Sequence, residues 1–525
     1  MWSNANSISN TAVATSTIKT KKKKRNQKLR QDASEKHKTV AFAATANLEK
    51  AIRQTREKVA KIAQEHKAQN RKFRDREFDL FVNKSDCLYS VGKESYTCTD
   101  VKRVSSLYKK PQFFIDGVEP NDIKQGAVGD CWFVASLAVI TNIPSLLETI
   151  CVARDEEVGV YGFIFFKVIE AYAKIHGDYE SISGGYTGQG IEDLTGGVYT
   201  TTFVSDILDK ERFWNEELKN VNDNTLFACA RYNDNNIEPK GTISGHAYSI
   251  LRVAEIEDGI KLVLVRNPWG GTEWTGAWSD GSKEWTSERM KILNHRFGDD
   301  GAFWMCYEDF LEYWNEIDKC RLFDSSWTVY STWINYNVVP KSNGKFTLTI
   351  PEKCDVVIVL QQPDDRYFSD PPKFEYQLSF RIYEKGNSTY LTRSRLTVPY
   401  GPRSVNHEVE LPAGTYEIIP HIYREPIVES ENPSNTSTDP SESDELKLLS
   451  KRRKEMYSKN KGLTLEGEPG EFPRKDEKNK DDADPEADTR ATEGGGDVEA
   501  DAKEGEEKKA DVEESNEDKK EEVER

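Results

Sequence analysis

Apolar positions near the start of the chain follow the spacing of a helix. Between Thr45 and Phe78, the apolar residues Leu48, Ile52, Val59 and Ile62 lie four, seven and three positions apart, so they form a narrow stripe on one helix face. A stripe this thin suits a helix on the surface of a domain. We expect the helix to dock on the domain that follows, with partner binding or membrane contact as the alternatives.

Folded protein is expected from about Phe78 to about Glu425, in two parts with different patterns. In the first part, the expected helices span Cys131–Asn142 and Ile169–Ser181, and the expected strands span Val160–Phe166, Ala247–Val253 and Leu262–Val265. After about Asp324, runs of Val, Thr, Tyr and Phe alternate with Pro, Gly and Asn, which is typical of a β-sandwich. The strands expected there are Trp327–Tyr336, Lys345–Ile350, Asp355–Gln361, Tyr376–Tyr383, Ser404–Leu411 and Thr415–Tyr423.

Charge is concentrated at the two ends of the 525-residue chain. Lys and Arg dominate residues 1–80, and Asp and Glu dominate residues 466–525. Such segments bury too little apolar surface to fold, so we expect disordered ends. The basic run Lys21–Arg25 fits a solvated arm, with nuclear import as the alternative.

Cysteine usage and the start of the chain indicate the compartment. The eight cysteines have no regular spacing and predict no disulfide framework, which favours a reducing environment. The polar N-terminal segment lacks the apolar core of a signal peptide, and the chain holds no run of about 18 apolar residues. We therefore expect a cytoplasmic protein.

Cys131 begins an apolar run directly after Asp130. We expect the Asp130 carboxylate to cap the helix by accepting a backbone N–H group of the first turn. The positive end of the helix dipole would then favour the thiolate of Cys131, which is the form that acts as a nucleophile. A cysteine in an apolar helix is more often a small core residue, so Cys131 alone does not establish chemistry.

His246 and Asn267 are expected to meet across a hairpin. If the strand that starts at Ala247 returns through a turn near Gly259, the pairing places His246 opposite position 269 or 271. Asn267 then lies a few residues along the same face, within diagonal range of the imidazole. The hairpin thus places a base beside an amide that orients it, as a thiol hydrolase requires.

Three motifs surround these residues: Gln-Gly-x-x-Gly-Asp-Cys-Trp from Gln125, Gly-His-Ala-Tyr-Ser from Gly245 and Arg-Asn-Pro-Trp-Gly from Arg266. With the segments 171–179, 192–197 and 300–305, they resemble the calpain family of papain-like cysteine peptidases. The resemblance covers about residues 78–425. It implies an α+β fold, in which a papain-like two-lobed protease core precedes a calpain-type β-sandwich and the charged termini are disordered.

On this resemblance the chain divides into four parts. Residues 1–77 form a basic disordered arm and an amphipathic helix, and residues 78–323 form the protease core, with a Cys lobe over about 78–200 and a His/Asn lobe over about 201–323. Residues 324–425 form the β-sandwich. Residues 426–525 form a disordered linker and an acidic tail.

The resemblance implies a role for each site residue. Cys131 would attack the peptide carbonyl, His246 would act as the base, and Asn267 would orient the imidazole. Gln125 would donate to the oxyanion, and Trp269 would shield the contact between His246 and Asn267 from water. Three glycines would let the substrate backbone lie close, although each also fits a turn residue; they are Gly184, Gly185 and Gly245.

The resemblance also implies two calcium sites in the protease core, although the chemistry itself needs no cofactor. The first would use Ile115 and Gly117 carbonyls and the Asp122 carboxylate, but Ile169 stands where a further acid is expected. The second would use Glu273, Asp280 and Asp300, with Ala302 in place of a further acid. Each site therefore lacks a carboxylate, so calcium as an activator stays open beside the alternative of solvated surface acids.

The interval between Cys131 and His246 is some dozens of residues shorter than the resemblance implies. The missing part falls at Phe166-Lys167 and would hold strands of the Cys lobe. Two hypotheses from different classes follow. The chain is a calcium-dependent-type cysteine endopeptidase that makes limited cuts in protein substrates, or it is an inactive homologue that serves as a binding scaffold. No nucleic-acid partner is expected, and the sequence does not indicate an oligomeric state.

Overall fold

The computed structural model describes ten stretches of the chain. They are residues 46–88, 98–113, 118–165, 172–232, 239–324, 326–332, 344–362, 364, 374–395 and 403–426. The predicted basic arm, nearly all of the predicted linker and tail, and the junction at Phe166-Lys167 lie outside the described residues. No described helix combines the length and the apolar composition needed to cross a bilayer.

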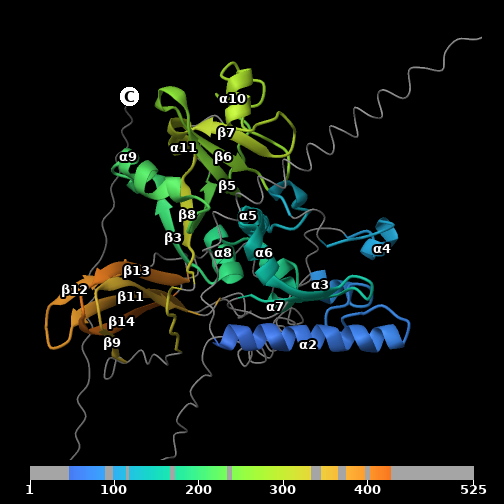
Figure 1. The fold of residues 1–525 in the computed structure, drawn as a ribbon, viewed down its shortest axis with the longest axis horizontal. Helices are drawn as coiled ribbons and strands as arrows, with labels where there is room; N and C mark the ends of the chain where they lie inside the picture. The colour runs from blue at the N-terminus through green and yellow to red at the C-terminus, as the bar shows by residue number, and fades with distance from the viewer. Residues whose placement is uncertain are drawn as a thin grey trace, which may run out of the picture. The chain divides into compact units, whose positions relative to one another are not determined.

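Helix α2 (Ala46–Ala68) packs on the antiparallel hairpin of β1 (Cys151–Asp155) and β2 (Val160–Phe163) (Figure 1). Its buried stripe consists of Leu48, Ala51, Val59 and Ala63. A Cβ atom on Gly162 would lie 2.6 Å from Thr55 Cγ2, so the helix approaches β2 more closely than a larger residue would allow. The predicted docking of this helix is confirmed, although the helix ends before Phe78.

Helix α5 (Cys131–Thr141) is surrounded by apolar side chains, and several of its residues, including Trp132, Ala135 and Val139, have no exposed surface. It contacts α6 (Pro144–Ile150) and α8 (Thr187–Thr195). The predicted helix over Cys131–Asn142 is therefore confirmed. Shorter helical segments precede and follow it: α3 (Lys84–Leu88), α4 (Val104–Leu107), η1 (Pro120–Asp122), α7 (Tyr172–His176) and η2 (Glu180–Ile182).

A six-stranded antiparallel sheet carries the second half of the site. Its strand order is β3 (Val198–Phe203), β8 (Glu316–Arg321), β4 (Thr225–Arg231), β5 (His246–Glu255), β6 (Lys261–Arg266) and β7 (Ala302–Cys306). Helix α5 packs on β5 and β4 (Figure 1). Ser249 Oγ donates to the Ala135 carbonyl oxygen at 2.9 Å. Strand β3 runs through residues 200 and 201, where we placed the border between the two lobes.

An aromatic cluster covers this sheet and fixes its strands. Trp214, Phe227, Tyr248 and Phe303 are buried together with residues of α11 (Tyr307–Tyr313). The remaining helical segments around the sheet are η3 (Val204–Asp206), α9 (Lys210–Arg212), η4 (Phe213–Glu217), η5 (Leu218–Asn220), η6 (Glu257–Gly259) and α10 (Ser287–Ile292).

The described residues from 344 to 426 include two antiparallel sheets that share one apolar core. One sheet has the order β12 (Tyr390–Arg393), β11 (Phe374–Glu384), β14 (Gly414–Pro426) and β9 (Phe346–Ile350), and the other pairs β10 (Cys354–Gln361) with β13 (Ser404–Leu411). Ile382 from the first sheet and Leu411 from the second are fully buried in this core. The predicted strand Trp327–Tyr336 is wrong for residues 327–332, which are irregular, and β12 was not predicted.

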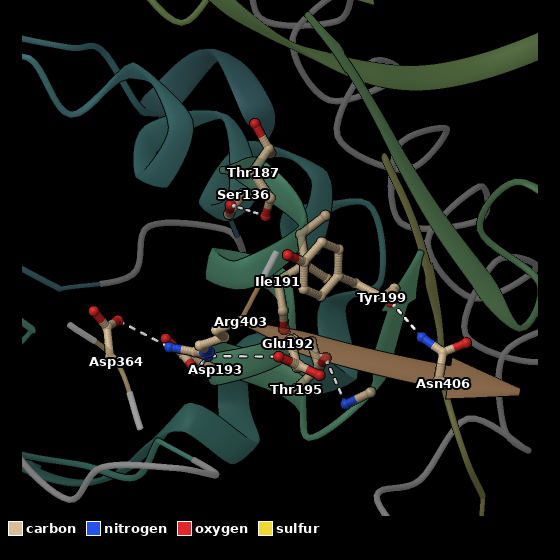
Figure 2. A network of polar contacts seen from close by, with 11 residues as sticks. Ser136, Thr187, Ile191, Glu192, Asp193, Thr195, Tyr199, Asp364, Arg403 and Asn406 are labelled. Carbon is tan, nitrogen blue, oxygen red and sulfur yellow. Dashed lines mark hydrogen bonds and ion pairs between the residues drawn. The ribbon is translucent and has the colours of Figure 1, made fainter. Parts of the chain in front are cut away.

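A buried polar network joins β13 to α8 (Figure 2). Arg403, directly before β13, forms ion pairs with Asp193 and with Glu192, the latter at 3.5 Å, and it donates to Asp364 Oδ2 at 2.9 Å. The side chains of Arg403, Asp193 and Glu192 are at most 8% exposed. Nearby, Asn406 Nδ2 donates to the Tyr199 carbonyl oxygen at 2.7 Å. The β10–β13 sheet therefore contacts α8 through charges withdrawn from water.

Candidate active site

Cys131 is the first residue of α5, and the helix start differs from the prediction. Two backbone groups, Phe133 N–H and Val134 N–H, each donate to the Asp130 carbonyl oxygen at 2.9 Å. The Asp130 carboxylate makes no capping hydrogen bond, because its backbone has φ −99° and ψ 27° rather than the extended conformation that a side-chain cap uses. The predicted capping role of Asp130 is therefore wrong.

Burial raises the pKa values of both titratable groups at this helix start, the Asp130 carboxyl and the Cys131 thiol. It raises the pKa of the Asp130 carboxyl to about 6, and Oδ1 of that carboxyl has no hydrogen-bond partner among the described residues. Burial also raises the pKa of the Cys131 thiol, and the nearby Asp130 charge adds to that rise. From the sequence we expected the helix dipole to lower the thiol pKa, but desolvation outweighs that effect. The backbone N–H groups of Ala247 and Trp132 lower the pKa, and they offset only part of the rise.

His246 begins β5, and Asn267 directly follows β6. The β5–β6 ladder starts at the pair of Ser249 and Arg266, so the predicted pairing of His246 with position 269 or 271 falls outside the ladder. His246 Nε2 lies 2.9 Å from Asn267 Oδ1. The amide orientation is set by its neighbours, because Asn267 Nδ2 donates to the Thr272 carbonyl oxygen at 3.0 Å and Trp269 N–H donates to Oδ1 at 3.1 Å. Oδ1 is therefore the acceptor, and His246 carries its proton on Nε2.

Two aromatic rings bracket the imidazole of His246. The ring centroid of Trp269 lies 4.7 Å from that of His246, and the ring of Tyr248 lies 5.0 Å away in an edge-on arrangement. Tyr248 Oη also accepts a hydrogen bond from Ile243 N–H at 2.8 Å. Burial lowers the pKa of His246, whereas the hydrogen bond with Asn267 raises it. The imidazole is thus fixed in place and disposed to be neutral, as a general base must be.

The structure brings the cysteine and the histidine segments together. Helix α5 packs on β5 and β4, and the backbone N–H of Ala247, the residue after His246, lowers the pKa of the Cys131 thiol. A second link joins the segment before α5 to the Asn267 loop, where Gln125 N–H donates to the Pro268 carbonyl oxygen at 2.9 Å. Helix α5 and strand β5 therefore meet where the sequence placed the nucleophile and the base.

The predicted oxyanion donor and the substrate glycines lie around this contact. Gln125 Nε2 donates to the Val128 carbonyl oxygen at 2.7 Å, so one amide hydrogen is engaged within the protein. Gly184, Gly185 and Gly245 all have positive φ angles, of +74°, +157° and +64°. No heavy atom of the described residues lies within 4 Å of a Cβ atom built on Gly184 or Gly245, so space beside both backbones is open.

Comparison with known proteins decides the family. A family profile described as calpain family cysteine protease matches residues 73–170 and 168–321, which include the three motifs and the six-stranded sheet. The chain belongs to the calpain family.

Curated calpains share about three in ten residues with this chain. A rice (Oryza sativa subsp. japonica) calpain-type cysteine protease ADL1 is 30% identical over 321 residues, covering 51% of this chain and 15% of the rice protein. Human calpain-9 is 27% identical over 409 residues, covering 61% of this chain and 59% of calpain-9. Calpain clp-4 of Caenorhabditis elegans is 33% identical over 271 residues, covering 42% of this chain and 38% of clp-4. The chain therefore spans well under two thirds of each of these calpains.

The two calpain-type calcium sites can be tested only in part. Ile115 and Gly117 lie outside the described residues, and Asp122 Oδ2 accepts a hydrogen bond from Glu119 N–H at 2.9 Å. In the second site, burial and the charges of Asp280 and Asp300 raise the pKa of Glu273. Within the described stretches, no group of three or more His, Cys, Asp or Glu side chains is arranged to hold a metal ion. The described acids do not form a calcium site in this conformation.

The two matched segments of the calpain profile meet at residues 168–170. This break lies beside Phe166-Lys167, where the sequence is shorter than the family resemblance implies. The strand β2 before it pairs with β1 and is covered by α2. The apolar strand thus has a partner on one edge and a helix on one face, which the sequence had not led us to expect.

Two residues that contact the site were not predicted. Tyr248 touches the imidazole of His246, and the Thr272 carbonyl oxygen fixes the amide of Asn267. Tyr248 could have been found, since the predicted strand places it two residues after His246 and on the same face. Thr272 acts through its backbone at φ +60° in an irregular loop, and side-chain patterns carry no such signal.

Proposed function

We propose that this calpain-family chain is a cysteine endopeptidase that makes limited cuts in proteins. Cys131 is the nucleophile, His246 the general acid and base, and Asn267 the group that orients the imidazole. The Cys131 backbone N–H and the Gln125 amide stabilise the oxyanion, and Trp269 shields the contact between His246 and Asn267. Gly184, Gly185 and Gly245 leave room for the substrate backbone.

The tautomer of His246 defines the direction of proton transfer. Its Nε2–H donates to Asn267, so Nδ1 is free to take the thiol proton as the sulfur adds to the peptide carbonyl carbon. When the C–N bond breaks, Nδ1–H protonates the leaving amine and a thioester remains. A water molecule then gives a proton to Nδ1 and adds to the thioester carbon, and the S–C bond breaks to regenerate the thiol and release a carboxylic acid.

One observation carries this proposal. The imidazole of His246 is fixed by Asn267 at 2.9 Å, and helix α5, which begins with Cys131, packs on the strand β5, which begins with His246. A cysteine and a histidine with purely structural roles are not expected to lie in this arrangement beside an orienting amide. The family of the chain supports the same assignment.

Hydrolysis of casein by the full chain tests the proposal. We expect the wild-type protein to cleave casein and Cys131→Ala to lose that cleavage while keeping the wild-type circular dichroism spectrum. Cys354→Ala is the matched control, because Cys354 is exposed and far along the chain from the site residues. Cleavage that is equal in wild type and Cys131→Ala would exclude the thiol mechanism.

An inactive calpain homologue that binds partners is the second candidate. Three observations favour it: the raised pKa of Cys131, the engagement of Gln125 with Val128, and the break in the family match at residues 168–170. A scaffold of this kind would bind proteins without cutting them, and wild type and Cys131→Ala would behave alike.

Further properties remain part of the proposal. We place the protein in the cytoplasm, with protein substrates, with no nucleic-acid partner and without a cofactor in the chemical step. Membrane contact has no support from the described residues. Whether calcium controls the peptidase depends on the chain segment between β6 and β7, because this segment carries the acids expected for the second calcium site.

A further inference from the structure

The chain between β6 and β7, residues 267–301, is here called the β6–β7 connection. It carries Asn267 at one end and all three acids expected for the second calcium site: Glu273, Asp280 and Asp300. Its two halves must be held together, because residues near Glu273 and residues near Asp300 both contact Asn267. Side chains of the connection itself supply the contacts that hold them.

Asp280 is held by a histidine and a backbone group from the second half of the connection. His295 Nε2 lies 2.7 Å from Asp280 Oδ1, and Gly298 N–H donates to Oδ2 at 2.7 Å. The His295 side chain is 8% exposed and stacks on Trp285, with ring centroids 4.4 Å apart and an interplanar angle of 25°. Phe297 meets the same imidazole edge-on at 5.6 Å. The rings of Trp285 and Phe297 therefore fix the imidazole of His295, and its Nε2 contacts the Asp280 carboxylate.

The other two acids also accept hydrogen bonds from the protein. Glu273 Oε1 accepts from Asp300 N–H at 3.0 Å and from Gly301 N–H at 2.7 Å. Asp300 Oδ1 accepts from Ala302 N–H at 3.0 Å, and its Oδ2 accepts from Asn121 Nδ2 at 2.7 Å. Each carboxylate thus already links two parts of the chain.

These contacts do not fit a calcium ion. Calcium takes about six to eight oxygen ligands, and ligand oxygens must point at the ion rather than at N–H groups. Both oxygens of Asp280 and both of Asp300 are engaged, and the position expected to supply a further acid is Ala302. We propose that the His295–Asp280 pair takes the place of calcium in holding the β6–β7 connection closed, so that this loop needs no calcium.

The connection in turn sets the amide of Asn267. Asn267 Nδ2 donates to the Thr272 carbonyl oxygen at 3.0 Å, and Asn267 N–H donates to the Gly301 carbonyl oxygen at 2.8 Å. A Cβ atom on Gly301 would lie 2.7 Å from the Asn267 carbonyl oxygen, so the two ends of the connection are in close contact. His295 is thus a positioning residue for Asn267, and that consequence alone depends on the proposed peptidase function.

Calcium binding by the full chain carrying Cys131→Ala tests the inference, because this background cannot digest itself. We expect isothermal titration with about 1 mM calcium, the range of weak calcium sites, to show no binding at this loop. Thermal unfolding should show the same Tm in calcium and in a chelator, since only a ligand of the folded state shifts Tm. Neither readout depends on peptidase activity, so failure of the proposed function would leave them unchanged.

A double variant tests whether His295 is the group that replaces the ion. In the same background, His295→Ala with Ala302→Glu frees Asp280 and adds the missing acid, and we expect its Tm to rise in calcium but not in magnesium. His295→Ala alone should lower Tm in the chelator. If the folded double variant stays indifferent to calcium, His295 does not stand in for calcium.

Asp280→Asn locates any calcium bound by the unchanged loop. A Tm rise that persists in Asp280→Asn but disappears in Asp122→Asn belongs to the other predicted site and supports the inference. A Tm rise that Asp280→Asn removes, in a variant whose circular dichroism spectrum is unchanged, would overturn it. Glu273→Gln serves as a second probe of the loop if Asp280→Asn fails to fold.

Discussion

The imidazole of His246 and the amide of Asn267 meet at 2.9 Å because neighbouring strands carry them to the same edge of one sheet. The thiol that they would serve comes from another part of the chain. Helix α5 packs on β5, and Ser249 Oγ of β5 donates to the Ala135 carbonyl oxygen of α5 at 2.9 Å. The site therefore depends on two separate structural contacts: the hairpin that pairs base and amide, and the packing of α5 on that hairpin.

Asn267→Ala should lower kcat with little change in KM. Without Oδ1, no side chain selects the tautomer in which Nδ1 of His246 is free, so general-base catalysis weakens by roughly 10²-fold or more. Steady-state hydrolysis of a fluorogenic peptide would measure the split between kcat and KM. Asn215→Ala is the matched control, because Asn215 is exposed and its side chain bonds only to nearby residues, the Glu211 carbonyl oxygen and Lys219 Nζ. A kcat for Asn267→Ala equal to that of the control would contradict the assigned role.

Asp130→Asn should speed alkylation of Cys131 by iodoacetamide. The Asp130 charge raises the pKa of the Cys131 thiol, so removing it increases the thiolate fraction by up to roughly tenfold, the effect of one pKa unit. The pKa of Asp130 is about 6, so wild type and variant should differ above pH 6 and converge below it, where Asp130 is neutral. Mass spectrometry would follow Cys131, with exposed Cys354 as an internal reference. Equal rates at pH 8 would show that the Asp130 charge does not reach the thiol.

Arg403→Met should destabilise the contact between β13 and α8. The change removes the Arg403 cation from the buried carboxylates of Glu192, Asp193 and Asp364, and removing one partner of a buried pair costs about 3–5 kcal/mol of the free energy of unfolding. Denaturant unfolding of the Cys131→Ala background would measure the loss.

Lys353→Met provides the comparison for Arg403→Met. Its ion pair with Glu410 is exposed on both sides, at 65% and 56% of the side-chain surface. Such pairs contribute about 0.2–1 kcal/mol. If the two variants lose the same stability, burial of the Arg403 network has no energetic importance.

Leu48→Ala should loosen the β1–β2 hairpin. Leu48 is 6% exposed and packs with Ile164 beyond the end of β2, so truncation is expected to cost roughly 2–5 kcal/mol. Hydrogen exchange of residues 151–163 should become faster, whereas Glu57→Ala on the exposed face of the same helix should leave it unchanged. Exchange that does not respond to Leu48→Ala would mean that α2 does not stabilise the hairpin.

The sequence predicted the parts of the site that follow from periodic patterns. The apolar run from Cys131 follows the spacing of a helix, and the two strands of the hairpin after Ala247 follow the spacing of a sheet. The strands predicted between residues 345 and 423 were found for the same reason, because their residues alternate regularly, although β12 was missed.

Electrostatic details at the site were harder to predict. The N-cap preference of Asp130 is a property of exposed helix starts, but here tertiary packing buries the carboxylate and turns its backbone away from the capping geometry. Desolvation of Cys131 likewise depends on which strand covers it. The cover of the β1–β2 hairpin comes from α2, a helix that ends more than eighty positions earlier in the chain, and the hydrogen bond from Arg56 Nε to the Val152 carbonyl oxygen at 3.2 Å is one such long-range contact.

Covalent labelling tests the central claim most directly. The full chain should be treated at neutral pH with a peptide-based thiol-reactive inhibitor, and the modified cysteine should be identified by mass spectrometry. The account predicts modification of Cys131 that disappears in His246→Ala, while exposed Cys354 stays unmodified at the same inhibitor concentration. Modification of Cys354 without Cys131, or labelling of Cys131 that does not need His246, would contradict a cysteine activated by this histidine.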